Sequence, residues 1–313
     1  MKVIIISGAT ATGKTDLGIK IARQVKSDVI NFDSLLLYQE LNIGTAKPSL
    51  EERGEVLHHM IDVSSIFNPL NAADYVKRTI PIINELHSKN KIPILVGGSG
   101  FYLQALLFGM YDSPTSPSDI IKRSQDLYEK EGIAPFHQIL QEKDHASFER
   151  YHENDHYRIR RAVEHFWTTG SPLSEERQKK DVKNKEINLT NTHGWETFHI
   201  YLKIPKEEHF EIITNRTHKM IETGLLDEVQ KLITQGFTGH EKPLQSIGYK
   251  EALDFLRGNI KSLEECKEKI SISTRQLAKA QKTWFNRIKE KETFNPLTET
   301  KDIFEALKMF LQK

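Results

Sequence analysis

The sequence predicts an α/β protein: a parallel β-sheet flanked by helices, with a helical insertion domain in the chain between two parts of this core. Short apolar runs rich in β-branched residues alternate with segments of helical periodicity before residue 112 and again after residue 197. Between them, residues 113–196 lose the strand pattern and are mostly charged or polar. We therefore expect a core made of residues 1–112 and 197–313, and a helical insertion of residues 113–196.

The composition is that of a globular protein with no membrane-spanning segment. The chain has 313 residues, of which 38% are hydrophobic and 28% charged, enough for a substantial core. Its net charge is only +1, so a nucleic-acid surface would have to be a local basic patch. The single cysteine, Cys266, excludes an internal disulfide framework and suits a reducing compartment. No apolar run is long enough to cross a membrane, and we expect a cytoplasmic protein.

The first elements of the chain are a strand, a glycine-rich loop and a helix. Residues 3–7 have the pattern of a buried strand, and residues 16–26 have helical spacing. The loop between them matches G-x-x-x-x-G-K-[ST], the P-loop pattern, with Gly8, Ala9, Thr10, Ala11, Thr12, Gly13, Lys14 and Thr15. Backbone N–H groups of such a loop hold phosphate oxygens at a helix N-terminus, the lysine reaches the terminal phosphates, and the hydroxyl can ligate Mg²⁺. The core is thus predicted to be a P-loop NTPase-like sheet with Thr15 as its metal ligand.

The second predicted strand, residues 28–34, carries a carboxylate at its end. In open α/β sheets, ligands bind outside the carboxyl ends of the strands, so Asp33 is expected to face the same crevice as the P-loop. A role in a turn or helix cap is the alternative for Asp33. The apolar residues 35–38 that follow either belong to the core or line a pocket for an apolar group. Lys47, in a turn-like segment, is a candidate second cation for phosphate.

The next strand, residues 91–96, follows a helix predicted at residues 71–89 and ends without an acidic residue. Many P-loop NTPases place an acid that orders the metal at such a strand end. Here the strand is followed by residues 97–100, Gly-Gly-Ser-Gly. We expect this backbone, which carries almost no side chains, to be approached closely by something bulky.

The second half of the chain returns to the α/β pattern and then becomes helical. The pattern predicts a strand at residues 198–203, helices within residues 207–235 with a break at Gly224, and a helical unit from residue 245. In the last long helix, Arg275, Lys279 and Lys282 share one face by their spacing. This face is either a solvated surface or a phosphate-contacting part of a nucleic-acid site.

Taken in order along the chain, these segments resemble the signatures of bacterial tRNA dimethylallyltransferases. The matching segments are GATATGKT (8–15), DSLLLY (33–38), IGTAKP (43–48), HHMID (58–62), AADY (72–75), VGGSGFY (96–102), SIGYKE (246–251) and RQLAKxQxTW (275–284). The resemblance is weakest between residues 113 and 155. It implies transfer of a dimethylallyl group from dimethylallyl diphosphate to N6 of the adenine 3′-adjacent to the anticodon of tRNA, with release of diphosphate and with Mg²⁺ as cofactor.

The resemblance also implies roles for individual residues. Asp33 matches the general base, Gly8 to Thr15 match the diphosphate cradle with Thr15 on Mg²⁺, and Arg216 matches an arginine that steadies the departing diphosphate. Residues that match tRNA-contacting positions are Asp33, Ser34, Leu35, Leu36, Ser99, Tyr157, Arg158, Ile159, Arg160, Arg161, Gln245, Gly248, Tyr249, Lys250, Arg275, Lys279, Gln281 and Lys282. The insertion is expected to contact the anticodon stem, and the protein is expected to be a monomer.

Three other functions are compatible with parts of the sequence. A P-loop kinase for a nucleoside or another small molecule would use ATP, with Asp33 as its base. A prenyltransferase acting on free adenine nucleotides would need neither the insertion nor the basic helix, and this chain has both. A nucleotide-switched RNA-binding module would bind nucleoside triphosphates tightly and transfer no prenyl group.

Overall fold

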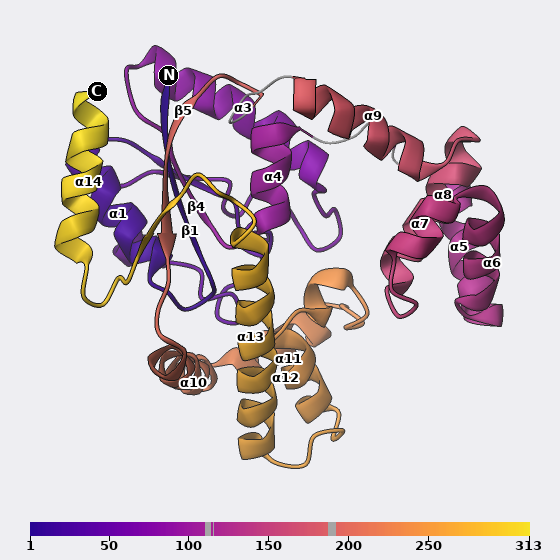
Figure 1. The fold of residues 1–313 in the computed structure, drawn as a ribbon. Helices are drawn as coiled ribbons and strands as arrows, with labels where there is room; N and C mark the ends of the chain where they lie inside the picture. Colours follow the sequence, from indigo (N-terminus) through magenta and orange to yellow (C-terminus); the bar gives the residue numbers. More distant parts are fainter. Residues whose placement is uncertain (110–113, 115, 187–191) are drawn as a thin grey trace. The chain divides into compact units, whose positions relative to one another are not determined.

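A computed structural model describes residues 1–109, 114, 116–186 and 192–313 of the chain (Figure 1). They form two compact units, one of Met1–Leu107 with His193–Lys313 and one of Phe108–Thr192. Both ends of the second unit lie a few residues before the boundaries predicted from the sequence. Among the described residues, no helix combines the length and apolar character needed to span a bilayer.

The first unit is built on a six-stranded parallel sheet with the strand order β3-β2-β4-β1-β5-β6. Its central strand, β1 (Lys2–Gly8), pairs with β4 (Ile94–Gly97) on one side and with β5 (Glu196–Leu202) on the other. The remaining strands are β2 (Val29–Asn31), β3 (His58–His59) and β6 (Glu292–Phe294). The short strands β3 and β6 were not predicted. Because the strands are parallel, their carboxyl ends meet at one edge, where ligands bind in such sheets.

Alternating side chains of the sheet bury its two faces under different helices. Apolar residues of β1, β4 and β5 pack against α1 (Lys14–Val25) and α14 (Thr300–Gln312) on one face (Figure 1). On the other face, the Tyr201 ring of β5 lies 5.8 Å from the Phe285 ring of α13 (Leu263–Phe285). The helix predicted at residues 71–89 is α3 (Ala72–Ser88). The helix α4 (Gly100–Phe108), which was not predicted, follows β4. Coverage of both faces explains why the strands are apolar runs rather than alternating ones.

A second apolar core in the same unit joins helices to the loop after β2. The helices are α10 (Lys206–Glu222), α11 (Leu225–Thr234), the 3₁₀ turn η1 (Lys242–Gln245), α12 (Tyr249–Leu256) and α13. The predicted break is confirmed, because Gly224 precedes α11 with a φ of 99°. Tyr38 and Leu41 belong to this core, and Leu37 is 1% exposed. Most of the apolar run after Asp33 is therefore core. A short helix, α2 (Leu50–Arg53), lies further along the same connection.

The second unit is helical, as predicted for the insertion. It contains α5 (Ser118–Glu131), α6 (Ala134–Lys143), α7 (His145–Arg150), α8 (His156–Thr169) and α9 (Leu173–Glu186). Phe136 and Leu140 of α6 pack against Ile159 and Val163 of α8 to form its core. This unit therefore has an apolar core of its own.

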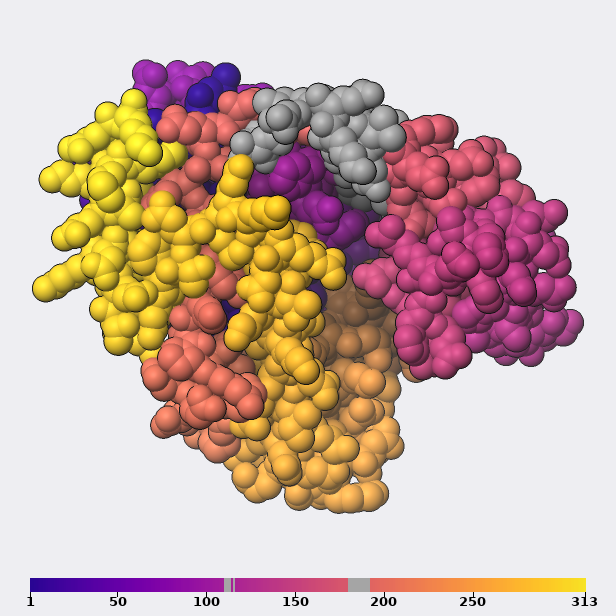
Figure 2. All heavy atoms as spheres, in the orientation of Figure 1, coloured from indigo at the N-terminus to yellow at the C-terminus, as the bar shows by residue number. Residues whose placement is uncertain are grey.

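The glycine-rich segment after β4 is approached closely, as expected, but by the protein itself. A Cβ added at Gly98 would lie 2.6 Å from Nε2 of Gln281, and one added at Gly100 would overlap the Trp284 ring. Both side chains come from α13, which with α10 and α14 forms much of the first unit's surface on the face shown in Figure 2. The absence of side chains at Gly98 and Gly100 thus makes room for side chains of α13.

This packing predicts that Gly100→Ala destabilises the fold. A methyl group that collides with a partly buried indole forces α4 and α13 apart, and overpacking of this kind costs about 1–3 kcal/mol. Urea unfolding should show that loss in the free energy of unfolding. Gln104→Ala, on the exposed side of the same helix, is the matched control and should stay within about 0.5 kcal/mol of wild type. Equal stability of the two variants would contradict the packing argument.

Candidate active site

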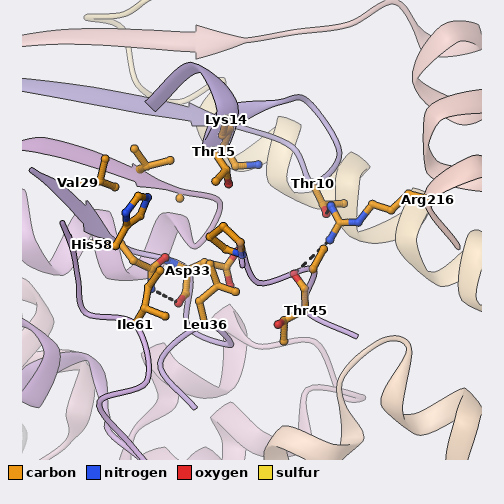
Figure 3. A pocket seen from close by; sticks show the side chains of 15 residues that line it. Thr10, Lys14, Thr15, Val29, Asp33, Leu36, Thr45, His58, Ile61 and Arg216 are labelled. Carbon is orange, nitrogen blue, oxygen red and sulfur yellow. Dashed lines mark hydrogen bonds between the residues drawn. The ribbon is translucent and has the colours of Figure 1, made fainter. Parts of the chain in front are cut away.

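A cavity of about 80 Å³ lies at the carboxyl ends of β1, β2 and β4 in the first unit (Figure 3). Its lining residues are Thr10, Lys14, Thr15, Val29, Asn31, Asp33, Leu36, Thr45, Ala46, Pro48, His58, Ile61, Val96, Gly97 and Arg216. Figure 3 shows Thr10 and Arg216 on one side and Val29, Ile61 and Leu36 on the other. The cavity therefore joins a cationic, hydroxyl-bearing side to a largely apolar side that also carries the His58 ring.

The P-loop has the local geometry that its sequence predicts. Gly13 adopts a left-handed conformation with φ 76°, which glycine tolerates without steric cost, and α1 begins at the next residue. Lys14 Nζ donates a 2.6 Å hydrogen bond to the carbonyl oxygen of Ala9, and the Thr12 hydroxyl donates one of 2.8 Å to the same atom. The ammonium group is thereby folded over the loop at the first turn of α1, where a phosphate is favoured.

Thr10 is held through all three of its polar groups by side chains from α10 and α13. Its N–H donates to Oε1 of Gln281 at 2.8 Å, its hydroxyl oxygen accepts from Nη1 of Arg216 at 3.1 Å, and its carbonyl oxygen is 2.8 Å from Nε2 of His209. Arg216 also donates from Nη2 to the carbonyl oxygen of Thr45 at 3.3 Å. The guanidinium is thus fixed between the P-loop and the loop that carries Thr45.

Two cationic side chains, Lys14 and Arg216, line the cavity, and neither forms a salt bridge with another described residue. The pKa of Lys14 is lowered from 10.5 to about 8, mainly by burial; the Asp33 charge opposes this shift and the Arg216 charge adds to it. Burial also lowers the pKa of Arg216, with Asp33 opposing the shift, but a guanidinium remains charged in proteins. Concentrated positive charge with little water around it favours a multiply charged anion such as a diphosphate.

Asp33 lies just beyond β2, which ends at Asn31 rather than at Asp33 as predicted. The Asn31 side chain forms the turn, because its Oδ1 accepts from the Asp33 N–H at 2.8 Å and its Nδ2 donates to the Asp33 carbonyl oxygen at 3.0 Å. Asn31 Nδ2 also donates to the carbonyl oxygen of Met60 at 2.8 Å. The Asp33 carboxylate accepts the Leu35 N–H through Oδ1 at 3.1 Å. The carboxylate is therefore held at the cavity as a positioned hydrogen-bond acceptor.

Some functional residues were not found from the sequence. Asn31, His209 and Thr45 each fix a group of the site, and only Asn31 has a sequence signal, as a polar residue inside the apolar run before Asp33. The prediction that Lys47 supplies a second cation is wrong. Its ammonium pairs with Asp62 at 2.5 Å, is 4% exposed and does not line the cavity.

The residues predicted to contact tRNA are only partly exposed to solvent. Ser34 lies next to Asp33, and its N–H donates to the Ser99 hydroxyl at 3.0 Å, so these two residues lie beside the cavity without lining it. Exposed in the first unit are Gln245, Lys250, Lys279 and Lys282, and exposed in the second are Tyr157 and Arg158. Partly buried are Leu35, Leu36, Arg160, Arg161, Arg275 and Gln281.

Three of the residues predicted to contact tRNA are buried in this structure, and a fourth, Arg275, is bonded within the protein. The Tyr249 side chain is fully buried, Ile159 is 1% exposed in the core of the second unit, and Gly248 is buried at the start of α12. Arg275 is used internally, since its Nη2 donates to the Thr214 hydroxyl at 2.9 Å and its guanidinium stacks 4.9 Å from the Phe210 ring. The buried side chains support their helices instead of offering a surface to RNA.

Comparison with known proteins agrees with this site. Residues 36–288, more than half of the chain, match the family model described as IPP transferase. The chain belongs to the IPP transferase family. A protein named tRNA dimethylallyltransferase 1 from Pelobacter propionicus is 36% identical over 91% of this chain and 89% of its own length, and a tRNA dimethylallyltransferase from Geobacter sulfurreducens is 35% identical over the same shares.

Solved structures support the same assignment. A full-length tRNA isopentenylpyrophosphate transferase from Bacillus halodurans is 30% identical, with a TM-score of 0.70 over 99% of this chain and 96% of its own. A eukaryotic dimethylallyltransferase described as acting on tRNA is also 30% identical, with a TM-score of 0.75 over 91% of this chain and 69% of its own. The predicted fold class, a P-loop-like α/β sheet flanked by helices, is confirmed for this IPP transferase.

The lowered pKa of Lys14 predicts that this IPP transferase loses affinity for diphosphates at alkaline pH. Lys14 is charged below about pH 8 in the free protein and loses its proton above it, whereas a bound diphosphate raises the pKa again. Affinity for dimethylallyl diphosphate, measured by calorimetry without tRNA, should fall by up to roughly tenfold per pH unit above about pH 8. In Lys14→Arg, whose guanidinium does not titrate, the profile should be flat. A fall of equal steepness in that variant would assign the titration to another group.

Proposed function

We propose that this protein transfers a dimethylallyl group from dimethylallyl diphosphate to N6 of the adenine that follows the anticodon in tRNA, releasing diphosphate. The observation that carries the proposal is the cavity itself, in which the P-loop and Arg216 face an apolar wall that includes Leu36, Ile61 and Val96. Such a cavity suits a ligand with a charged diphosphate and an apolar prenyl chain. The named relatives support tRNA as the acceptor.

The residues at the cationic side suit the charge changes of this reaction. As the allylic C–O bond breaks, negative charge accumulates on the departing diphosphate. Lys14 and Arg216 both line the cavity, and the Arg216 guanidinium is fixed by Thr10, so we expect little reorganisation in the transition state. This preorganisation is the main contribution that we assign to the P-loop and to α10.

Thr15 is the proposed protein ligand of Mg²⁺. Its side chain lines the cavity at the start of α1, and no cluster of three or more His, Cys, Asp or Glu suited to a metal lies among the described residues. Mg²⁺ commonly takes one or two protein oxygens, substrate phosphate oxygens and several waters, so a single hydroxyl beside a phosphate site fits it. When bound, the ion would neutralise diphosphate charge.

Asp33 is the proposed general base. The adenine N6 forms a bond to C1 of the dimethylallyl group, the C1–O bond breaks with its electron pair going to diphosphate, and one N6 proton passes to the Asp33 carboxylate. An exocyclic aryl amine is weakly basic, so its proton is taken during or after attack. The base must leave the stacked anticodon loop to reach C1, as enzymes that modify bases require.

The proposed tRNA surface combines residues beside Asp33 with exposed basic residues. Ser34 and Ser99 lie beside Asp33, and Lys279, Lys282 and Lys250 supply exposed positive charge on the first unit. The second unit offers Tyr157 and Arg158 to the anticodon stem. Lysine and arginine contacts to phosphates would position the RNA without reading its sequence.

A transfer assay tests the reaction. Purified protein, Mg²⁺ and labelled dimethylallyl diphosphate should label a tRNA with adenine 3′ to the anticodon, and should not label the same tRNA with guanine there or free AMP. Label on AMP would instead establish a free-nucleotide prenyltransferase. No label from folded protein that ATP stabilises against heat would favour the kinase alternative.

Substitution of Asp33 tests the base. Asp33→Asn keeps an oxygen that can accept the Leu35 N–H but removes the proton acceptor, and should lower the single-turnover rate by about 10²–10⁴-fold. Binding of dimethylallyl diphosphate should be retained. Asp302→Asn, an exposed carboxylate on α14, is the control. Turnover near that of wild type would remove Asp33 from the mechanism.

A further inference from the structure

One carboxylate outside the cavity holds the loop that completes it. Glu228 of α11 accepts hydrogen bonds from three consecutive backbone N–H groups, those of Asn42 at 3.2 Å, Ile43 at 2.9 Å and Gly44 at 3.4 Å. Consecutive N–H groups that converge in this way form a nest for an anion. The nest is therefore filled by the protein's own side chain, contributed from 184 residues further along the chain than Gly44.

Tyr249 forms the floor of this arrangement. Its hydroxyl donates to Oε1 of Glu228 at 2.5 Å, and burial together with the neighbouring Glu228 charge raises the pKa of Tyr249, so that it stays a donor. Its ring packs so closely on Gly44 that a Cβ added there would overlap the ring. The loop backbone is thus fixed from two sides, by a carboxylate and by an aromatic ring.

The residues directly after the nest line the cavity. Thr45, Ala46 and Pro48 are part of its wall, and Ala46 has a φ of 49°, a conformation that is costly for alanine and needs support from its surroundings. The carbonyl oxygen of Thr45 accepts from Arg216. A shift of the loop would therefore move both the wall and the acceptor that orients the guanidinium.

We propose that Glu228 is a positioning residue for prenyl transfer: its carboxylate fills the backbone nest of residues 42–44 and so sets the Thr45 carbonyl that orients Arg216 toward the diphosphate. Glu228 does not line the cavity, so it acts on the reaction only through Thr45 and Arg216. The inference rests on the proposed function, because it assigns Arg216 to the leaving diphosphate. It also gives Tyr249 a role other than the tRNA contact predicted from the sequence.

Chemical rescue tests the proposal in the full-length protein. Glu228→Ala empties the nest, which is reachable because Glu228 is only partly buried, and should lower the transfer rate by about 10- to 100-fold, the range for a misplaced catalytic group. Added formate should fill the nest and restore much of that rate. Glu228→Gln, whose NH₂ cannot accept the loop N–H groups, should lower the rate while KM for tRNA is unchanged. Asp227→Ala, which removes an exposed acid on the same helix, is the control. Its transfer rate should equal that of wild type and should not change when formate is added.

Affinity for inorganic diphosphate gives a readout independent of transfer. Glu228→Ala should bind diphosphate more weakly than Asp227→Ala, and formate should restore the affinity, even if wild type transferred no prenyl group and the proposed function failed. Transfer by the Glu228 variants equal to that of Asp227→Ala would overturn the positioning role. So would a loss of activity that parallels a loss of thermal stability and that formate does not reverse, because that pattern indicates a purely structural carboxylate.

Discussion

The clamp on Thr10 is the constraint on which the site depends. A glycine-rich loop is flexible by composition, yet a diphosphate cradle must present its N–H groups in one arrangement before the ligand arrives. Here the N–H, hydroxyl and carbonyl groups of Thr10 are satisfied by Gln281, Arg216 and His209. These side chains lie about two hundred residues or more beyond the loop, so its geometry is set by the helices that follow β5.

The same helices explain why the edge of the sheet differs from that of a nucleotide hydrolase. After β4, glycines admit Gln281 and Trp284 where an acid that orders a metal often stands. Gln281 also donates from Nε2 to the Gly98 carbonyl oxygen at 2.9 Å, so one side chain links the P-loop to the end of β4. The site is consequently enclosed by helices and loops of the first unit, with an apolar wall opposite its cations.

Charge and burial act against each other in this cavity. Holding Lys14 and Arg216 away from water costs free energy, which appears as a lowered pKa for each. Among the described residues neither is neutralised by a salt bridge, and Asp33 interacts with both only at longer range. A bound diphosphate would supply the opposite charge that these two buried cations lack, which favours binding and, later, the charge of the leaving group.

The sequence by itself determined the features that depend on local backbone chemistry. These are the P-loop between strand and helix, the parallel strands as continuous apolar runs, the helix break at Gly224, the helical insertion and the place of Asp33 near the carboxyl end of a strand, although β2 itself ends at Asn31. Tertiary structure decided which polar side chains meet: Asn31 with Asp33, His209 with Thr10, Glu228 with residues 42–44, and Lys47 with Asp62. It also buried Tyr249 and Ile159, which were predicted at an RNA surface. Periodicity reports which face of an element is apolar, but not its partner, because partners distant in sequence are chosen by packing of the whole chain.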